Sequence, residues 1–205
     1  SSTSTVAPTT GEELKLIKVK TYNQLVRGAL DEENVILELQ NDIKLRCCTA
    51  RYCNGLADGK FPCTEKEEKR NQGARDVYGC PCEHEIQHTS KHSNQDTIMT
   101  ITDGQTVRIT SQKHYTISAG NGCRMFKVNT GGKLYLENVM IAETTQYASG
   151  AGIAINAGGF VKAEKTTFKA NKNNQHQGGA FFIAKDAELR CRECRFLGNH
   201  GSRVG

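Results

Sequence analysis

The chain has 205 residues, a mildly basic net charge of +5 at neutral pH, nine cysteines and no tryptophan. Its length suits one domain with a sizeable core, and so small a net charge gives no reason to expect a nucleic-acid partner. No apolar run approaches the roughly 18 residues of a membrane-spanning helix, so we expect no transmembrane segment.

The chain is predicted to begin with a flexible tail at residues 1–10, which are rich in Ser and Thr. The sequence does not begin with Met, so we expect that a targeting peptide has been removed. Residues 11–45 are predicted to form an N-terminal cap. Alternating apolar residues predict strands at 14–19, 35–39 and 43–45.

A short helix is predicted between the first two of these strands. Thr21 and Gln24 have capping-box spacing, and an amphipathic stripe that includes Leu25, Val26 and Ala29 follows them. Such a helix can cover the open end of a stack of coils, which would otherwise expose its core.

Residues 46–95 break the strand pattern and are predicted to form a disulfide-rich insert. Six of the nine cysteines lie in this segment, which has few aliphatic residues. Such density is typical of a disulfide framework in an oxidising compartment. The six candidates for disulfides are Cys47, Cys48, Cys53, Cys63, Cys80 and Cys82.

The cysteine content predicts an extracytoplasmic location. The sequence has no Asn-x-Ser/Thr glycosylation site, so nothing marks passage through a glycosylating route. The extracellular space or cell surface, the periplasm and an organelle lumen such as the thylakoid lumen all stay open.

The insert also contains a motif typical of zinc proteases. His84 and His88 have HExxH spacing around Glu85, and His92 follows four residues later. On a helix such histidines share a face and can hold Zn²⁺. Pro81 and the cysteines beside it interrupt that helix. We therefore favour a solvated polar segment over a metal site or catalysis, and we expect no metal and no other cofactor.

Residues 96–205 contain a repeat with a period of 27 to 28 residues. Segments 124–144, 151–171 and 179–199 align, and a fainter copy begins near Met99. Within each copy, apolar residues alternate in short runs separated by Gly or Asn, which is strand periodicity. A repeat of this size indicates a solenoid whose units bury apolar surface by stacking. We therefore predict an all-β fold, a parallel β-helix.

The alignment predicts which residues stack on one another. One interior column is expected to contain Val107, Leu134, Val161 and Leu189. Asparagines recur at two corners of the repeat, where they can hydrogen-bond along the stack. These residues are Asn129, Asn156, Asn171 and Asn199.

Cys191 and Cys194 align with interior positions of the earlier repeats. They are predicted to be core residues or to form a local disulfide. Their Cys-x-x-Cys spacing lacks a thioredoxin-like context, so a redox site is not expected.

The repeats resemble those of a known family. Gly178-Gly179-Ala180-Phe181 followed by Phe196-Leu197-Gly198-Asn199 is similar to the GGA and FxxN repeats of polymorphic outer-membrane-type proteins. These proteins belong to the pectin-lyase-like superfamily. The resemblance covers roughly residues 97–205 and implies a right-handed parallel β-helix. The superfamily includes lyases, hydrolases, adhesins and silent scaffolds, so the fold does not select a function.

Outward-facing residues of the repeat form a candidate binding column, with adjacent rungs about 4.8 Å apart. Its members are Arg108, Tyr135, Lys162 and Arg190. These basic and aromatic groups suit an acidic protein or an acidic glycan.

The neighbouring column holds the candidate catalytic residues. Glu137 and Glu164 are expected on adjacent rungs beside Lys162 and Arg190. Carboxyl groups about 5 Å apart suit a retaining glycosidase. Alternatively, these charges neutralise one another and serve only structure. The aspartate clusters that the superfamily's hydrolases place on neighbouring coils are missing from these repeats.

We therefore predict a non-catalytic binding or scaffold protein, either an accessory subunit of a larger assembly or a surface interaction module. The next Gly-Gly-Ala is expected near position 206, so a protein partner or further chain is expected on the open C-terminal rung. The alternative is a polysaccharide lyase or hydrolase of the pectin-lyase-like type that acts on acidic glycans.

Overall fold

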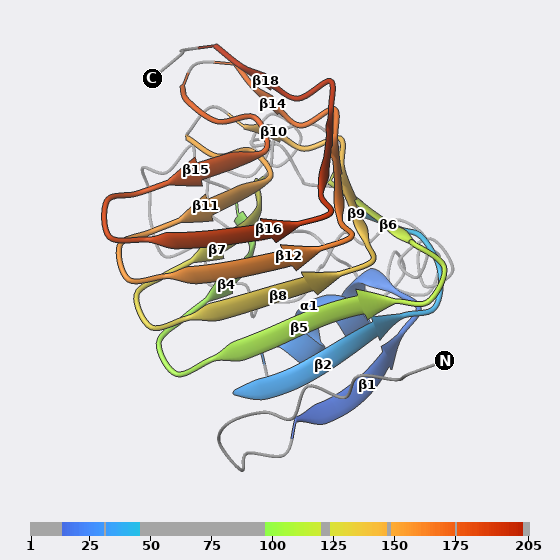
Figure 1. Cartoon of the computed structure of the whole chain (residues 1–205). Coiled ribbons are helices and arrows are strands. Elements are labelled where there is room, and N and C mark those ends of the chain that lie inside the picture. The colour runs from blue at the N-terminus through green and yellow to red at the C-terminus, as the bar shows by residue number, and fades with distance from the viewer. Residues whose placement is uncertain are drawn as a thin grey trace, which may run out of the picture.

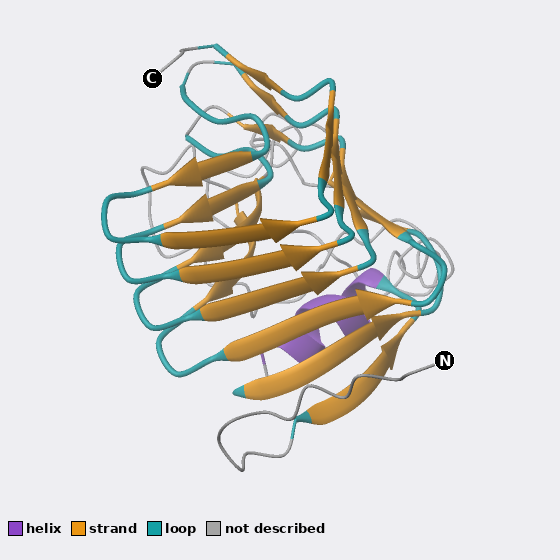
Figure 2. Ribbon diagram, viewed as in Figure 1, coloured by secondary structure: helices purple, strands orange, loops and turns teal. Residues whose placement is uncertain are grey.

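The computed structural model describes residues 14–30, 32–45, 97–119, 124–146, 149–174 and 176–202. They form a parallel β-solenoid of about four turns, as predicted (Figure 1). Three sheets run along the stack, and a smaller fourth sheet lies at one corner (Figure 2).

Sheet A is the largest and has the strand order β1-β2-β5-β8-β12-β16. Every neighbouring pair in it is parallel. Its strands are β1 (Lys15–Val19), β2 (Asn34–Leu39), β5 (Thr106–Ser111), β8 (Lys133–Glu137), β12 (Phe160–Glu164) and β16 (Glu188–Arg192).

The other sheets complete each rung. Sheet B contains β3 (Ile43–Leu45), β6 (Thr116–Ala119), β9 (Met140–Ala142), β13 (Thr167–Lys169) and β17 (Arg195–Leu197). Sheet C contains β4 (Thr97–Ile101), β7 (Arg124–Val128), β11 (Ile153–Ile155) and β15 (Phe181–Ile183). Sheet D contains β10 (Thr145–Gln146), β14 (Lys172–Asn173) and β18 (His200–Gly201).

The predicted N-terminal helix is present as α1 (Tyr22–Leu30). Its capping box forms, because the Gln24 backbone N–H donates to Thr21 Oγ1 at 3.3 Å and the Thr21 backbone N–H donates to Gln24 Oε1 at 3.3 Å. Leu25, Val26 and Ala29 are buried in the common core. The helix packs against the first strands and so closes the core at this end (Figure 1).

The repeat alignment is confirmed strand by strand. Val107 pairs with Leu134, Leu134 with Val161, and Val161 with Leu189. The first three are fully buried, and Leu189 packs half-buried against the core in the last described rung. Apolar residues pointing inward from all three main sheets thus stack into one continuous core.

The repeated Gly-Gly pair has a separate backbone reason at each of its two positions. Gly131 and Gly158 have φ of 75° and 72°, a left-handed conformation that glycine adopts without strain. At the next position the rungs approach closely. A Cβ on Gly132 would lie 2.8 Å from the Ile101 carbonyl oxygen, and one on Gly159 would lie 2.8 Å from that of Val128.

The predicted asparagine stacks also form. Asn156 Nδ2 donates to Asn129 Oδ1 at 2.8 Å, and Asn171 Nδ2 donates to Asn199 Oδ1 at 2.9 Å. Asn171 is fully buried, and its Oδ1 accepts from Thr144 Oγ1 at 2.8 Å. These amides satisfy backbone and side-chain groups at corners where the sheets end.

The first described coil begins before the predicted insert, because β2 pairs with β5 and β3 with β6. The insert at 46–95 and the tail at 1–10 lie outside the described residues. The six predicted disulfide cysteines and the three histidines His84, His88 and His92 lie there too. In the described part of the chain, no helix is long and apolar enough to cross a membrane.

Candidate binding face on sheet A

The outward face of sheet A carries the predicted binding column in register. Arg108 pairs with Tyr135, Tyr135 with Lys162, and Lys162 with Arg190. Two apolar residues extend the column toward the N-terminus, since Ile36 pairs with Arg108 and Leu16 with Ile36. Both residues lie in strands that the sequence predicts. The predicted column did not include them, because the repeat alignment begins after them.

Two aromatic rings lie between two guanidinium groups on this face. The centroids of the Tyr135 and Phe160 rings are 5.6 Å apart. Arg108 Cζ lies 5.5 Å from the centroid of Tyr135, and Arg190 Cζ lies 5.4 Å from that of Phe160. These distances are those of cation–π contacts. We call the four residues the cation–aromatic ladder.

Phe160 was not predicted as part of the face, although its position after Gly159 shows that it starts a strand. It pairs with Lys133 on one side and Glu188 on the other, in the column next to Tyr135. A diagonal neighbour in a sheet lies within reach of an aromatic side chain. The alignment of columns alone therefore could not place its ring against Tyr135.

Glu164 is held as an anion by two cations. Its Oε1 lies 2.9 Å from Lys162 Nζ, and its Oε2 lies 3.1 Å from an Nη atom of Arg192. The hydrogen bond from Lys162 is the largest cause and lowers the pKa of Glu164. Burial is the next largest and opposes it, and the hydrogen bond from Arg192 lowers the pKa further. Its carboxylate is ionised at neutral pH.

Glu137 pairs with Glu164 on the neighbouring strand, as the alignment predicts. It is exposed, and none of the described residues forms an ion pair with it. A glycosidase needs one carboxyl group that is protonated near its working pH, usually through burial or a like charge. Glu164 departs from this requirement, because its environment favours the carboxylate.

Lys162 and Arg190 both have an acidic neighbour two residues away on their own strand. Lys162 contacts Glu164, and Arg190 contacts Glu188. Such exposed pairs contribute little to the free energy of folding, so the acidic group of a partner can replace the glutamate at little cost. Arg108 differs, because it forms no ion pair with any residue that the structure describes.

The cysteines of the last rung are free thiols rather than the local disulfide that was one of the two predictions. Cys191 pairs with the buried Ala163, so it has an interior register position. It is nevertheless exposed, because β16 pairs only with β12 among the described strands. Its thiol is still partly shielded from water, and this desolvation, followed by the neighbouring Cys194, raises the pKa of Cys191 to about 12, so the thiol is protonated at neutral pH.

One buried cation lies outside this face. Arg124 of β7 donates to the carbonyl oxygens of Gly150 at 2.8 Å and Ser149 at 2.6 Å. Burial lowers the pKa of Arg124 to about 10, so the guanidinium is still charged at neutral pH. Its contacts join neighbouring rungs, which is a structural role.

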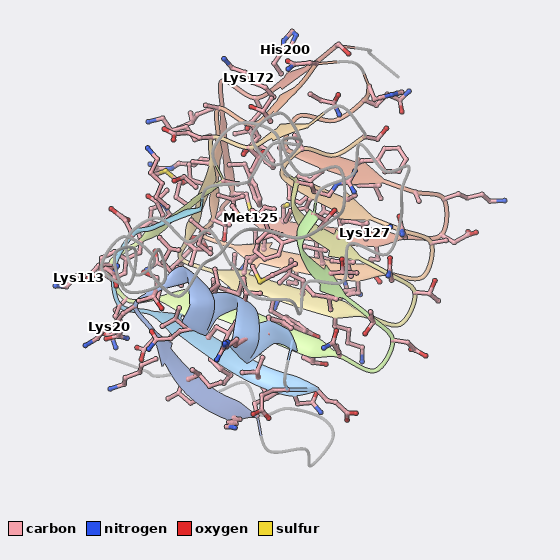
Figure 3. All side chains as sticks on the ribbon, turned by 180° about the vertical axis from the view of Figure 1, so that it is seen from behind. Lys20, Lys113, Met125, Lys127, Lys172 and His200 are labelled. Carbon is pink, nitrogen blue, oxygen red and sulfur yellow. The ribbon has the colours of Figure 1, made fainter. Side chains whose placement is uncertain are left out.

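Other basic side chains are spread over the molecule. In the view from behind, Lys127 lies on sheet C, and Lys172 and His200 lie together at the end of the stack (Figure 3). Lys172 and His200 are paired across β14 and β18. None of these residues has a ring contact like those of Arg108 and Arg190 among the described residues.

Within the described ranges, no group of three or more His, Cys, Asp and Glu side chains is placed to hold a metal ion. No protein family model matches the chain, and no curated protein or solved structure is significantly similar to it.

Proposed function

We propose that this chain is a non-catalytic binding or scaffold protein that holds an anionic partner on the outward face of sheet A. The proposal includes a right-handed β-helix of the pectin-lyase-like type and an extracytoplasmic location, for which the nine cysteines are the support. It also includes a role as an accessory subunit of an assembly or as a surface interaction module.

The main support is the cation–aromatic ladder. Arg and Tyr, with Trp, are enriched at the energetically important positions of interfaces. Here ring contacts hold two arginines and two aromatic rings beside one another on one sheet, so part of their side-chain entropy is already lost before binding. Arg108 offers an anion a guanidinium that no described carboxylate occupies.

The enzymatic alternative has less support on the same face. Its two carboxyl groups, Glu137 and Glu164, lie on adjacent strands, but Glu164 is bound by Lys162 and Arg192. A carboxylate with a lowered pKa is a poor general acid at neutral pH. A function in binding needs no such group.

The test compares binding with turnover in the same preparations. Polyglutamate and polygalacturonate serve as anionic probes, and wild type is compared with an Arg108→Gln, Arg190→Gln double variant. We expect the double variant to weaken polyglutamate binding about tenfold or more, and added salt to weaken wild-type binding as well. A Lys127→Gln, Lys172→Gln variant makes the same charge change on other sheets and should bind like wild type.

Turnover is measured with polygalacturonate and with other acidic polysaccharides. The proposal predicts no product from wild type. Cleavage by wild type that a Glu137→Gln, Glu164→Gln variant abolishes would establish the enzyme and refute the proposal. Equal binding by wild type and the Arg108, Arg190 variant would refute the proposed face.

A further inference from the structure

We infer that the partner on sheet A is a segment of another protein, acidic at one end and apolar at the other, that lies along the solenoid axis. Its apolar end contacts β1 and β2, and its acidic end reaches toward β16. The inference rests on the proposed function, and it names the chemical class of the ligand for that face.

The central column of the face changes its chemistry along the stack. Leu16 on β1 is 57% exposed, and Ile36 on β2 is half-buried beside it. The next residue in the column is Arg108, after which the cation–aromatic ladder begins. A ligand that covers the whole column must therefore contact aliphatic side chains at the β1 end and cations toward the β16 end.

The aliphatic end distinguishes a protein ligand from a glycan. Covering Leu16 and Ile36 is favourable only for a group that is itself apolar, because sugar hydroxyls placed against them would lose water without gaining hydrogen bonds. Leu, Ile, Val or Phe side chains of a protein supply such groups. Aromatic rings accept either class, so Tyr135 and Phe160 do not discriminate between them.

The charged end favours an acidic partner. Across the outward positions of the six strands, six side chains are basic and four are acidic. The central column contains Arg108, Lys162 and Arg190 and no acid. Glutamate or aspartate of a partner can contact Arg108 directly and can replace Glu164 or Glu188 on the other two cations.

The column sets the length of the segment. Six strands spaced about 4.8 Å apart extend over about 24 Å, which an extended chain covers with about seven residues. Alternate side chains of such a segment face the sheet, so one or two apolar residues and two acidic residues make the contacts.

The experiment uses three labelled peptides of about ten residues. The first has Leu and Phe at one end and Glu at the other. The second has the same composition with apolar and acidic residues interspersed, and the third has Ser in place of every apolar residue. Heparin and polygalacturonate are the glycan probes. Affinities for the full chain are measured by fluorescence anisotropy or, for the glycans, by competition.

The deciding variants change the apolar end alone. We expect Leu16→Ser with Ile36→Ser to weaken binding of the first peptide about tenfold and to leave the Ser-substituted peptide unaffected. Leu16→Glu changes an exposed position, so we expect the protein to fold. This variant should weaken binding of the first peptide at least as much as the double Ser variant does. Leu197→Ser removes a residue of similar exposure (49%) from sheet B and should have no effect.

Each other outcome overturns the inference in a distinguishable way. If Arg108→Gln weakens peptide binding but the Leu16 and Ile36 variants do not, the partner does not contact the apolar end of the column. The proposed function then stands without this inference. If a glycan binds more tightly than every peptide, or the interspersed peptide equals the first, the ligand class or its arrangement is wrong. If no probe depends on Arg108 or Arg190, the proposed function fails together with the inference.

Discussion

Lys162 Nζ lies 2.9 Å from Glu164 Oε1, and the two residues occupy the same face of β12. This pair bears on the choice between a binding surface and an enzymatic site on the outward face of sheet A. One of the two carboxyl groups of the enzymatic alternative, Glu164, is held as a carboxylate and so is a poor general acid, whereas Arg108 and Arg190 stack on aromatic rings. These contacts are the basis of the proposed binding function.

The Lys162–Glu164 pair gives a prediction about stability and pH. Because the pKa of Glu164 in the folded chain lies below its ordinary value of 4.5, ionised Glu164 stabilises the fold above that pH. The stabilisation is lost as pH falls through the lowered folded-state pKa. We expect Glu164→Gln to cost at most about 1 kcal/mol at pH 7, since both partners are partly exposed.

The measurement is urea unfolding of wild type and Glu164→Gln at pH 7 and at pH 3. The difference between them should shrink at pH 3. A difference that grows on acidification would mean that the pKa of Glu164 is raised, and would restore it as a candidate acid.

The asparagine stacks give a second prediction. Replacing the fully buried Asn171 by Ala leaves the Thr144 hydroxyl and the Ile141 carbonyl without their amide partner. We expect a loss of about 2–4 kcal/mol of unfolding free energy. Asn129→Ala is the matched control, because Asn129 is half-buried and should cost about 1 kcal/mol. Equal losses, measured by urea unfolding, would contradict this ranking.

Much of this fold could be predicted because each copy of the repeat has the same alternation of apolar and polar residues. The alternation around Leu134, Val161 and Leu189 marks the interior, and the period gives the pairing. The environment of Cys191 could not be predicted in the same way. Its register position is interior, but its exposure depends on what pairs with β16, which the alignment does not contain.

The corners that follow sheet B give a third prediction. Ala170 has φ of 53°, and Gly198 takes the corresponding position of the next rung with φ of 59°. A left-handed alanine is strained, whereas glycine is not. We expect Ala170→Gly to raise the unfolding free energy by up to about 1 kcal/mol. A clear loss of thermal stability would show that the alanine side chain contributes more than its backbone strain costs.

Two phenylalanines of the same rung should behave in opposite ways. Phe168 is fully buried and stacks on Phe196 with ring centroids 5.4 Å apart, whereas Phe160 lies on the outward face. Phe168→Ala should cost about 3–5 kcal/mol of stability. Phe160→Ala should cost much less and should weaken polyglutamate binding severalfold, because Arg190 loses its ring contact.

Thermal unfolding and anisotropy on both variants test this contrast. A Phe160→Ala protein that binds polyglutamate like wild type would remove the aromatic part of the ladder from the account.

The candidate binding face was predicted less completely than the fold. The column from Arg108 to Arg190 follows from register alone. The stacking of Arg190 on Phe160 depends on side-chain conformation and was not predictable. The neutralisation of Glu164 was one of the two interpretations of the charged column, and only the side-chain contacts with Lys162 and Arg192 select it. The strand register predicts which residues are neighbours in an outward column, but not which of their side chains contact one another.

The most direct measurement of the central claim is an amide chemical-shift map of the full chain during titration with polyglutamate. The account predicts saturable shifts that cluster on β5, β8, β12 and β16, with the largest at Arg108, Tyr135 and Arg190. Sheet C and the Lys172–His200 pair should change little. Shifts centred on Lys172 and His200, or spread evenly over all basic residues, would contradict the claim that sheet A holds the partner.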